Sequence, residues 1–175
     1  APGAEEMETV ITVDVLRRAG LEVALAGVNG PEAVTCSRKV RIVPDCGLAH
    51  ARGPFDLIAL PGGAKGAEAL AASPEVQALL REQQQAGRFM GAICAAPIAL
   101  VAAGVGKGAR LTSHPAVRDK VASFGAYSEE RVEQDANIVT SRGPGTAFEF
   151  ALKLVELLLG KDATGKLAAP MVMKQ

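Results

Sequence analysis

Short apolar stretches alternate with amphipathic ones along the chain, and this order limits the folds that it can adopt. Extended stretches are expected at 21–28, 34–36, 40–43, 55–60, 88–94, 110–114 and 137–141. Helices are expected over 3–20, from residue 73 onward, over 95–104 and over 145–159. Strands that alternate with helices indicate a mostly parallel sheet covered by helices on both faces, an α/β sandwich.

Local signals support several of these helices. The stretch 3–20 has apolar residues at helical spacing, acids in its first turns, arginines in its last turn, and Gly20 as a C-cap. Ser73 and Pro74 are typical of an N-cap and a first helical residue. The stretch 145–159 carries a continuous apolar face, which predicts a helix packed against the core.

Length and charge limit the class of protein. The 175 residues are a suitable size for one domain spanning 1–175, and 49% of them are hydrophobic, enough for a core without disulfides or metal. The 19 basic residues balance the 19 acidic ones, which argues against a strong nucleic-acid-binding or membrane-surface patch. We find no signal peptide pattern and no apolar run long enough to span a bilayer.

The cysteines and glycines argue against a metal or nucleotide cofactor. Cys36, Cys46 and Cys94 are odd in number and lack metal-ligand spacing, and the chain has only two histidines. The glycines at 62 and 63 lack the spacing of phosphate-binding or dinucleotide-binding loops. We therefore expect no cofactor and three free thiols, which indicates a reducing compartment, the cytosol by default.

The first expected helix has no strand before it. In an α/β sandwich, a helix whose first-turn acids serve a site at the sheet edge usually follows a strand. We therefore expect that about ten residues forming a further strand precede residue 1.

Cys94 is the first candidate for chemistry. It lies between the apolar stretch that begins at residue 88 and the helix expected from 95, where backbone N–H groups and a positive helix end favour a thiolate. The small residues around it, in Gly91-Ala-Ile-Cys94-Ala-Ala96, suit a sharp strand-to-helix elbow. The competing interpretation is a buried structural thiol, because free cysteine is among the most buried residue types.

Further candidates fall at neighbouring strand ends. Gly62 and Gly63 follow the stretch 55–60, and His114 ends the stretch 110–114. All three are therefore expected beside Cys94 at the carboxyl edge of the sheet. A glycine there lets a backbone N–H act as an oxyanion donor, and a histidine there can shuttle protons. The simpler alternatives are a plain turn and an ordinary loop histidine.

One acidic residue is expected to serve Cys94. Glu5, Glu6 and Glu8 all lie in the first turns of the first expected helix, where solvated acids stabilise the helix dipole. A carboxyl that faced the thiol in a dry pocket would have a raised pKa and could donate a hydrogen bond to a thiolate. The pattern alone leaves open which of the three does so.

Several motifs together resemble the DJ-one (DJ-1) family of the class I glutamine-amidotransferase-like superfamily, over nearly the whole chain. They are Gly3-Ala-Glu-Glu-Met-Glu-Thr-Val, Ala26-Gly, Val34-Thr-Cys-Ser-Arg38, Leu60-Pro-Gly-Gly63, Ala92-Ile-Cys94-Ala, Thr112-Ser-His-Pro115, Arg131-Val-Glu and Thr140-Ser-Arg-Gly-Pro-Gly-Thr-Ala-Phe-Glu-Phe150. The resemblance implies a flavodoxin-like three-layer sandwich that works as a homodimer, and a strand before Gly3.

The resemblance also implies the roles of individual residues. Catalytic residues would be Cys94 as nucleophile and redox-sensitive thiol, Glu8 as its hydrogen-bonded acid and His114 as an assisting group. The N–H groups of Gly63 and Ala95 would form the oxyanion site. The mouth of the pocket would be lined by two arginines, Arg18 and, from the other subunit, Arg38.

The implied function is that of a cofactor-independent protein and nucleotide deglycase, a hydrolase with glyoxalase-type activity. Its substrates would be methylglyoxal-type carbonyls and early glycation adducts of proteins and nucleotides. The alternative is an oxidative-stress sensor and redox-dependent chaperone, through oxidation of Cys94 to sulfinic acid. A third alternative is an inactive scaffold. The family is described in cytoplasm, nucleus and mitochondria.

The sequence also departs from the family pattern. Val43 stands where vertebrate members have a cysteine, with Cys46 nearby, so a cross-subunit role for that thiol does not carry over. Ala64 and Ala96 replace an asparagine and a glycine beside the site, which leaves substrate preference open. Related protease-like enzymes have a histidine directly after the nucleophile, and Ala95 in that place argues against a peptidase.

Overall fold

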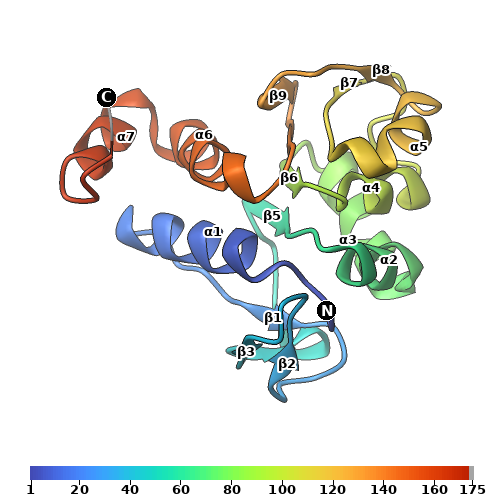
Figure 1. Ribbon diagram of the computed structural model, residues 1–175, viewed down its shortest axis with the longest axis horizontal. Helices are drawn as coiled ribbons and strands as arrows, with labels where there is room; N and C mark the ends of the chain where they lie inside the picture. The colour runs from blue at the N-terminus through green and yellow to red at the C-terminus, as the bar shows by residue number, and fades with distance from the viewer. Residues whose placement is uncertain (174–175) are drawn as a thin grey trace.

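The chain forms a layered α/β structure around a mostly parallel sheet, as the sequence predicts. The computed structural model describes residues 1–173 (Figure 1). The central sheet has the order β5 (Leu57–Leu60), β6 (Phe89–Ile93), β10 (Ile138–Ser141), β9 (Val132–Asp135). The pairs β5–β6 and β6–β10 are parallel, and only β9 runs antiparallel to its neighbour.

Helices cover both faces of this sheet. One layer contains α1 (Glu6–Arg18), α6 (Ala147–Leu159) and α7 (Lys161–Ala168), and the other contains α2 (Ala64–Ala72), α3 (Pro74–Gln85), α4 (Pro97–Ala103) and α5 (Arg118–Ala122) (Figure 1). A hydrophobic cluster fills each space between helices and sheet. Strand β6 contributes to both clusters, Ile93 to one and Met90 and Ala92 to the other, which is expected for a central strand that is covered on both faces.

Short strands and turns complete the architecture. The strand pairs are β1 (Ala26–Gly27) with β4 (Cys46–Gly47), β2 (Val34–Thr35) with β3 (Arg41–Ile42), and β7 (Arg110–Leu111) with β8 (Ala126–Tyr127). Single 3-10 turns occur at Leu48–His50, Pro115–Val117 and Pro144–Thr146. None of the helices in residues 1–173 combines the length and hydrophobicity needed to cross a bilayer.

Several helix ends follow the predicted signals. Ser73 Oγ accepts a hydrogen bond from the Val76 N–H at 3.3 Å, which makes Ser73 the N-cap of α3. Gly104 ends α4 in the left-handed conformation, with φ of 72°. The first helix begins at Glu6 rather than near residue 3, because Gly3 has a φ of 79° that a helix does not allow.

Other expectations were wrong in detail. The stretch 21–28 is paired as a strand only at Ala26–Gly27, so residues 21–25 lack the ladder expected of them. Six helices and strands were not predicted: α2, α5, α7, β4, β8 and β9. The helix α2 was missed because it follows Gly63 and has no side-chain N-cap to mark its start, and it packs against α4.

Candidate active site

Cys94 lies at a sharp elbow between β6 and α4. Its φ is 65°, a left-handed conformation that costs an L-residue about 1–2 kcal/mol. Two backbone hydrogen bonds of 2.8 Å hold it there: its N–H donates to the Ser141 carbonyl, and its carbonyl accepts from the His114 N–H. The strained elbow predicted from the small neighbours of Cys94 is therefore present, and its side chain is only 8% exposed.

Glu8 is fully buried beside Cys94. Its Oε2 accepts a hydrogen bond from the Gly62 N–H at 2.7 Å, whereas its Oε1 has no hydrogen-bond partner among residues 1–173. Burial raises the pKa of Glu8 to about 7, although the Gly62 N–H and the neighbouring Cys94 act in the opposite direction. The structure thus distinguishes Glu8 from the other acids of α1 as the one in a dry site.

The other two acids have structural roles. Glu5 is the N-cap of α1, and its carboxylate accepts from the Glu8 N–H at 2.8 Å. Glu6 accepts from the Ser37 hydroxyl at 2.7 Å and from the Arg38 N–H at 2.8 Å. These contacts anchor the hairpin β2–β3 to the first turn of α1. Neither acid is therefore available as the proton carrier for Cys94.

The glycines after β5 bring the acid and the thiol together. A Cβ on Gly62 would lie 2.6 Å from the Cys94 Cβ and 2.8 Å from Glu8 Oε2, closer than real atoms approach. Gly63 has a φ of 81° and packs against the backbone of residues 3–5. Its N–H and that of Ala95 bond to the Cys94 sulfur and lower its pKa. The sequence suggested the N–H of either glycine as an oxyanion donor, whereas the N–H of Gly62 binds Glu8 and its missing side chain lets Glu8 and Cys94 meet.

The sequence-based expectation of a low pKa for Cys94 describes only part of its environment. Burial and the negative charge of an ionised Glu8 raise the pKa of Cys94 to about 12, and the N–H groups of Gly63 and Ala95 only partly offset this. The helix end contributes little because α4 starts at Pro97, three residues later, and has seven residues. The protonation state of the Cys94 thiol therefore depends on whether Glu8 is ionised.

Glu8 and Cys94 titrate as a pair because they share one buried site. The pKa of Glu8 is raised to about 7 and that of Cys94 to about 12, so one proton remains on the pair between these values. A buried carboxyl oxygen without a partner, Oε1, is available to carry it. The site can therefore hold a nucleophile and a proton donor together near neutral pH.

A methyl group at position 62 is expected to damage this site. Gly62→Ala should reduce stability by about 1–3 kcal/mol, because the added Cβ would also lie 2.9 Å from the Ile93 carbonyl. It should also remove activity by separating Glu8 from Cys94. Urea unfolding checks the first effect, with Gly165→Ala as control because no atom lies within 4 Å of its added Cβ. Equal stability of both variants would contradict the close contact.

His114 reaches the site through its backbone. Its N–H binds the Cys94 carbonyl, while its exposed ring accepts from the Ala116 N–H at Nδ1, at 3.1 Å, and so caps the turn Pro115–Val117. The ring lies beside Gly143. Its role as an assisting group stays a prediction.

The two predicted arginines are not brought to Cys94 within this chain. Arg18 lies ten residues after Glu8 on α1, about 15 Å along the helix axis, and pairs with Asp14 at 2.5 Å. Arg38 lies on the hairpin β2–β3 with its guanidinium 3.4 Å from the Ser37 carbonyl. Their proposed place at the mouth of the pocket stays a prediction that involves a second subunit.

A buried hydrogen-bond network behind the elbow was not predicted from the sequence. The Ser141 and Thr146 hydroxyls lie 2.6 Å apart, and Thr146 Oγ1 also accepts from the N–H groups of Arg142 and Gly143. This network holds Ser141 in place, and the carbonyl of Ser141 accepts the hydrogen bond from the Cys94 N–H. The motif at residues 140–150 can be recognised in the sequence, but the same pattern is also typical of a simple helix start.

Among residues 1–173, no cluster of three or more histidine, cysteine, aspartate or glutamate residues could hold a metal ion.

Comparison with known proteins identifies the family. The model described as the DJ-1/PfpI family matches residues 1–157. The chain belongs to the DJ-1/PfpI family. This confirms the resemblance read from the motifs, and with it the flavodoxin-like α/β fold.

Individual members of the DJ-1/PfpI family are similar to this chain over nearly its whole length. The "Parkinson disease protein 7 homolog" of Danio rerio is 50% identical over 178 residues, covering 99% of this chain and 94% of the relative. The crystal structure of Drosophila melanogaster DJ-1beta matches with a TM-score of 0.97 and 48% identity, covering 100% of this chain and 95% of that one. A Caenorhabditis elegans relative, 44% identical over 172 residues, covers 97% of this chain and 91% of its own length, and is named "Glutathione-independent glyoxalase DJR-1.2".

Proposed function

We propose that the chain is a cofactor-independent, cysteine-dependent glyoxalase and deglycase. Its substrates would be methylglyoxal-type carbonyls and early glycation adducts of proteins and nucleotides. The observation that carries the proposal is the buried pair of Glu8 and Cys94, in which Glu8 Oε1 is left without a partner. The name of the Caenorhabditis elegans relative supports the same reaction class.

The geometry suits a proton-coupled attack on an aldehyde. The Cys94 thiolate would add to the aldehyde carbon while Glu8 donates its proton to the oxygen. Backbone N–H groups of Gly63 and Ala95 would stabilise the developing negative charge. Glu8, as carboxylate, would then take the proton from that carbon and return it to the neighbouring carbonyl carbon, while the hydroxyl proton moves to the neighbouring oxygen, so that the hemithioacetal becomes a thioester. Water would cleave the resulting thioester, so that the net reaction adds one water to methylglyoxal and yields lactate.

Early glycation adducts would follow the same route. A hemiaminal or hemithioacetal formed by methylglyoxal carries the same two-carbon unit, with an amine or thiol as leaving group. Cys94 would replace that group, and the proton on Glu8 would leave with the amine. His114 would assist as a second proton carrier. The product is again lactate, together with the free amine or thiol.

The decisive experiment measures where the shared proton resides. Because the proposed mechanism places on Glu8 the proton that remains on the pair, we expect the ultraviolet absorbance of the Cys94 thiolate to appear well below pH 12, the value at which Cys94 would titrate beside an ionised Glu8. Lactate formation from methylglyoxal, measured on the same samples, should rise over the same pH range. The control is Cys94→Ala, which removes the absorbance of this thiol and leaves those of Cys36 and Cys46.

Two results would overturn this proposal. Thiolate absorbance that appears only above pH 10 would show that Glu8 is the ionised member of the pair and that Cys94 is a thiol. A lactate rate equal to that of free thiol with added base would show that the site contributes no catalysis.

A homodimer is part of the proposal. The helix α1 exposes Met7 at 53% and Val10 at 52%, and the neighbouring loop after β2 exposes Val40 at 49%. Because Glu6 binds the hairpin directly, these apolar residues lie on two elements in contact, which suits a subunit interface. Arg38, on the same hairpin, would reach the partner's site from there. A cytoplasmic location with nuclear and mitochondrial pools also stays a prediction.

A redox-sensing function is the second candidate, and the unpartnered Glu8 Oε1 also favours it. A protonated Oε1 could donate to an oxygen of a Cys94 sulfinate and stabilise that oxidation state. The two functions differ in one measurement. If about two equivalents of peroxide, the amount that sulfinate formation consumes, convert Cys94 to sulfinate while methylglyoxal turnover stays at the level of free thiol and base, sensing is the better account.

A further inference from the structure

The only tyrosine of the chain, Tyr127, binds the peptide group that holds the Cys94 backbone. It is the last residue of β8 and pairs with Leu111 of β7. Its hydroxyl donates a hydrogen bond of 3.1 Å to the Ser113 carbonyl. Ser113 is fully buried, so its carbonyl depends on donors from within the protein. The guanidinium of Arg118 lies over the Tyr127 ring, 5.3 Å from the ring centre.

The peptide group between Ser113 and His114 transmits this contact to Cys94. A trans peptide group is rigid and planar, and its C=O and N–H point in opposite directions. The C=O of this trans group accepts from Tyr127, and its N–H donates to the Cys94 carbonyl at 2.8 Å. The Tyr127 hydroxyl therefore orients the N–H that holds the Cys94 carbonyl.

A second peptide group continues the connection to the sulfur. The Cys94 carbonyl and the Ala95 N–H belong to one trans peptide group, and that N–H bonds to the Cys94 sulfur. Three hydrogen bonds therefore run in series from the Tyr127 hydroxyl, through two peptide groups, to the thiol. We call this series the relay. Hydrogen bonds in such a series polarise one another, so each donor is strengthened by the bond before it.

We propose that Tyr127 is a positioning residue for the reaction of Cys94, because through the relay it orients and strengthens the Ala95 N–H. This inference rests on the proposed function, in which the N–H groups of Gly63 and Ala95 stabilise the negative charge that develops on the substrate oxygen. Only the Ala95 donor depends on the relay. Gly63 follows β5 and packs against the backbone of residues 3–5, so its N–H is held independently.

Arg142 supports the same peptide group as Tyr127. Its Nε donates to the Ser113 carbonyl at 3.4 Å, and its Nη1 donates to the Glu129 carbonyl at 3.1 Å. The Ser113 carbonyl would therefore keep one donor if the Tyr127 hydroxyl were removed. We expect such a change to misalign the peptide group rather than release it.

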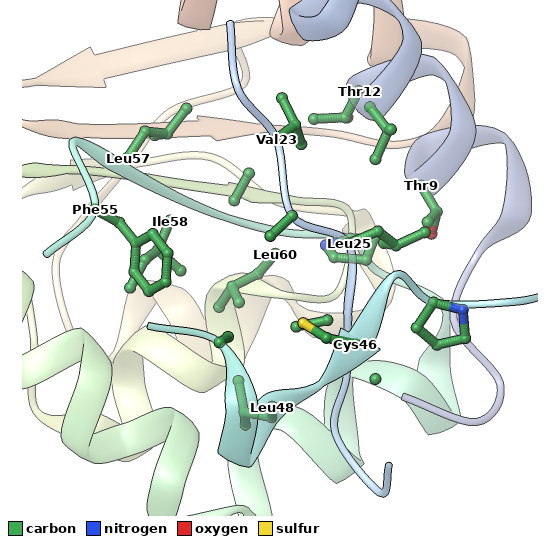
Figure 2. A pocket seen from close by; sticks show the side chains of 18 of the residues that line it. Thr9, Thr12, Val23, Leu25, Cys46, Leu48, Phe55, Leu57, Ile58 and Leu60 are labelled. Carbon is green, nitrogen blue, oxygen red and sulfur yellow. The ribbon is translucent and has the colours of Figure 1, made fainter. Parts of the chain in front are cut away.

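The relay is separate from the apolar cavity that Figure 2 shows beside Val23 and Leu57. Neither Cys94, Ser113 nor Tyr127 lines that cavity. A substitution at Tyr127 should therefore act on the elbow and leave this part of the core unchanged.

Tyr127→Phe tests the proposal because it removes only the hydroxyl. We expect kcat for lactate formation from methylglyoxal to fall about tenfold, less than the roughly 10²–10³-fold that loss of an oxyanion donor itself costs. KM should be unchanged, because the relay acts on the transition state rather than on substrate binding. The matched control is Ser123→Ala. The Ser123 hydroxyl also donates to a backbone carbonyl, that of Lys120 at 2.9 Å, but has no contact with the relay, so this variant should keep the parent rate.

Amide hydrogen exchange measures the relay independently of catalysis. In Tyr127→Phe, exchange at His114 and Ala95 should be about two- to tenfold faster, as expected when one hydrogen bond is lost. Exchange at Gly63 and in α7 should be unchanged, and Ser123→Ala should match the parent chain at all these amides. Urea unfolding of each variant corrects the exchange rates for any change in global stability.

A second variant makes the same test if Tyr127→Phe does not fold. Arg142→Met removes the other donor to the Ser113 carbonyl, so it should also accelerate exchange at His114 and Ala95 and lower kcat at unchanged KM.

Three results would overturn the proposal. Unchanged exchange at His114 and Ala95 would show that the hydroxyl does not orient these peptide groups. A parent-like kcat with faster exchange would show that the hydrogen bond is only structural. A raised KM with unchanged kcat would show that Tyr127 acts on substrate binding.

Failure of the proposed function would look different from failure of the relay. The parent chain and its variants would then all form lactate no faster than free thiol with added base. Exchange at Ala95 would still decide whether Tyr127 orients this N–H.

Discussion

Cys94→Ser is expected to abolish lactate formation from methylglyoxal while the fold is retained. Serine can adopt the same backbone conformation and is close in size, so the elbow and its two backbone hydrogen bonds should persist. The hydroxyl, however, is a weak nucleophile unless a base activates it, and a Glu8 that carries the shared proton cannot act as that base. The measurement is the rate of lactate formation, with circular dichroism to check the fold.

The other cysteines offer a matched control. Cys46 is half-buried and lies on β4, away from Cys94, so Cys46→Ser should keep the parent rate. Full turnover in Cys94→Ser would remove Cys94 as nucleophile. An equal loss in Cys46→Ser would mean that the chemistry does not depend on the elbow.

Glu8→Gln is expected to reduce turnover by about 10²–10⁴-fold, the usual contribution of a positioned acid–base group. The amide oxygen of glutamine can still accept from the Gly62 N–H, so the local structure should be retained. The amide cannot give up a proton to the substrate oxygen or take one from the substrate carbon. The loss should therefore appear in kcat rather than in KM.

The same variant should change how stability depends on pH. Burial raises the pKa of Glu8 from 4.5 to about 7, so the folded state binds the proton more tightly than the unfolded state. The stability gained from the first proton that the buried pair of Glu8 and Cys94 releases is complete below pH 4.5 and is lost as pH rises through 7. The free energy of unfolding of the parent chain, relative to Glu8→Gln, should thus fall by about 3 kcal/mol over this range.

Urea unfolding of both proteins at pH 4.5 and pH 8 measures this difference. Other carboxyls with shifted pKa values, such as Glu6, are present in both proteins and cancel in the comparison. A difference that stays constant between the two pH values would show that Glu8 has an ordinary pKa. In that case it could not hold the proton near neutral pH, and its proposed role would fail together with the stability effect.

Much of the fold could be predicted because its signals are local. Ser73 and Pro74 marked the start of α3, and the apolar stretches at 55–60, 88–94 and 137–141 contain β5, β6 and β10. Each signal depends on residues within a few positions of one another. The helix α2 and the antiparallel β9 were missed because α2 starts without a side-chain cap and β9 is mostly polar, and packing against neighbours stabilises both.

The candidate site was predicted only in outline. The strand ends placed Cys94, the glycines after β5 and His114 at one edge of the sheet, and the structure brings the first two together. The ring of His114 caps a short turn, and burial beside Glu8 raises the pKa of Cys94 where the elbow pattern alone predicts a lowered one. Both differences concern side-chain environment, which depends on residues distant in the chain.

By itself, the sequence determined the α/β class, the elbow at Cys94 and a set of three acids from which a partner could come. These follow from local periodicity, small residues and family resemblance. Only the tertiary structure decided that Glu8 is the buried acid and that Gly62 joins it to Cys94. The physical reason is that burial and hydrogen bonding set the pKa values, and both depend on contacts across more than fifty residues of sequence.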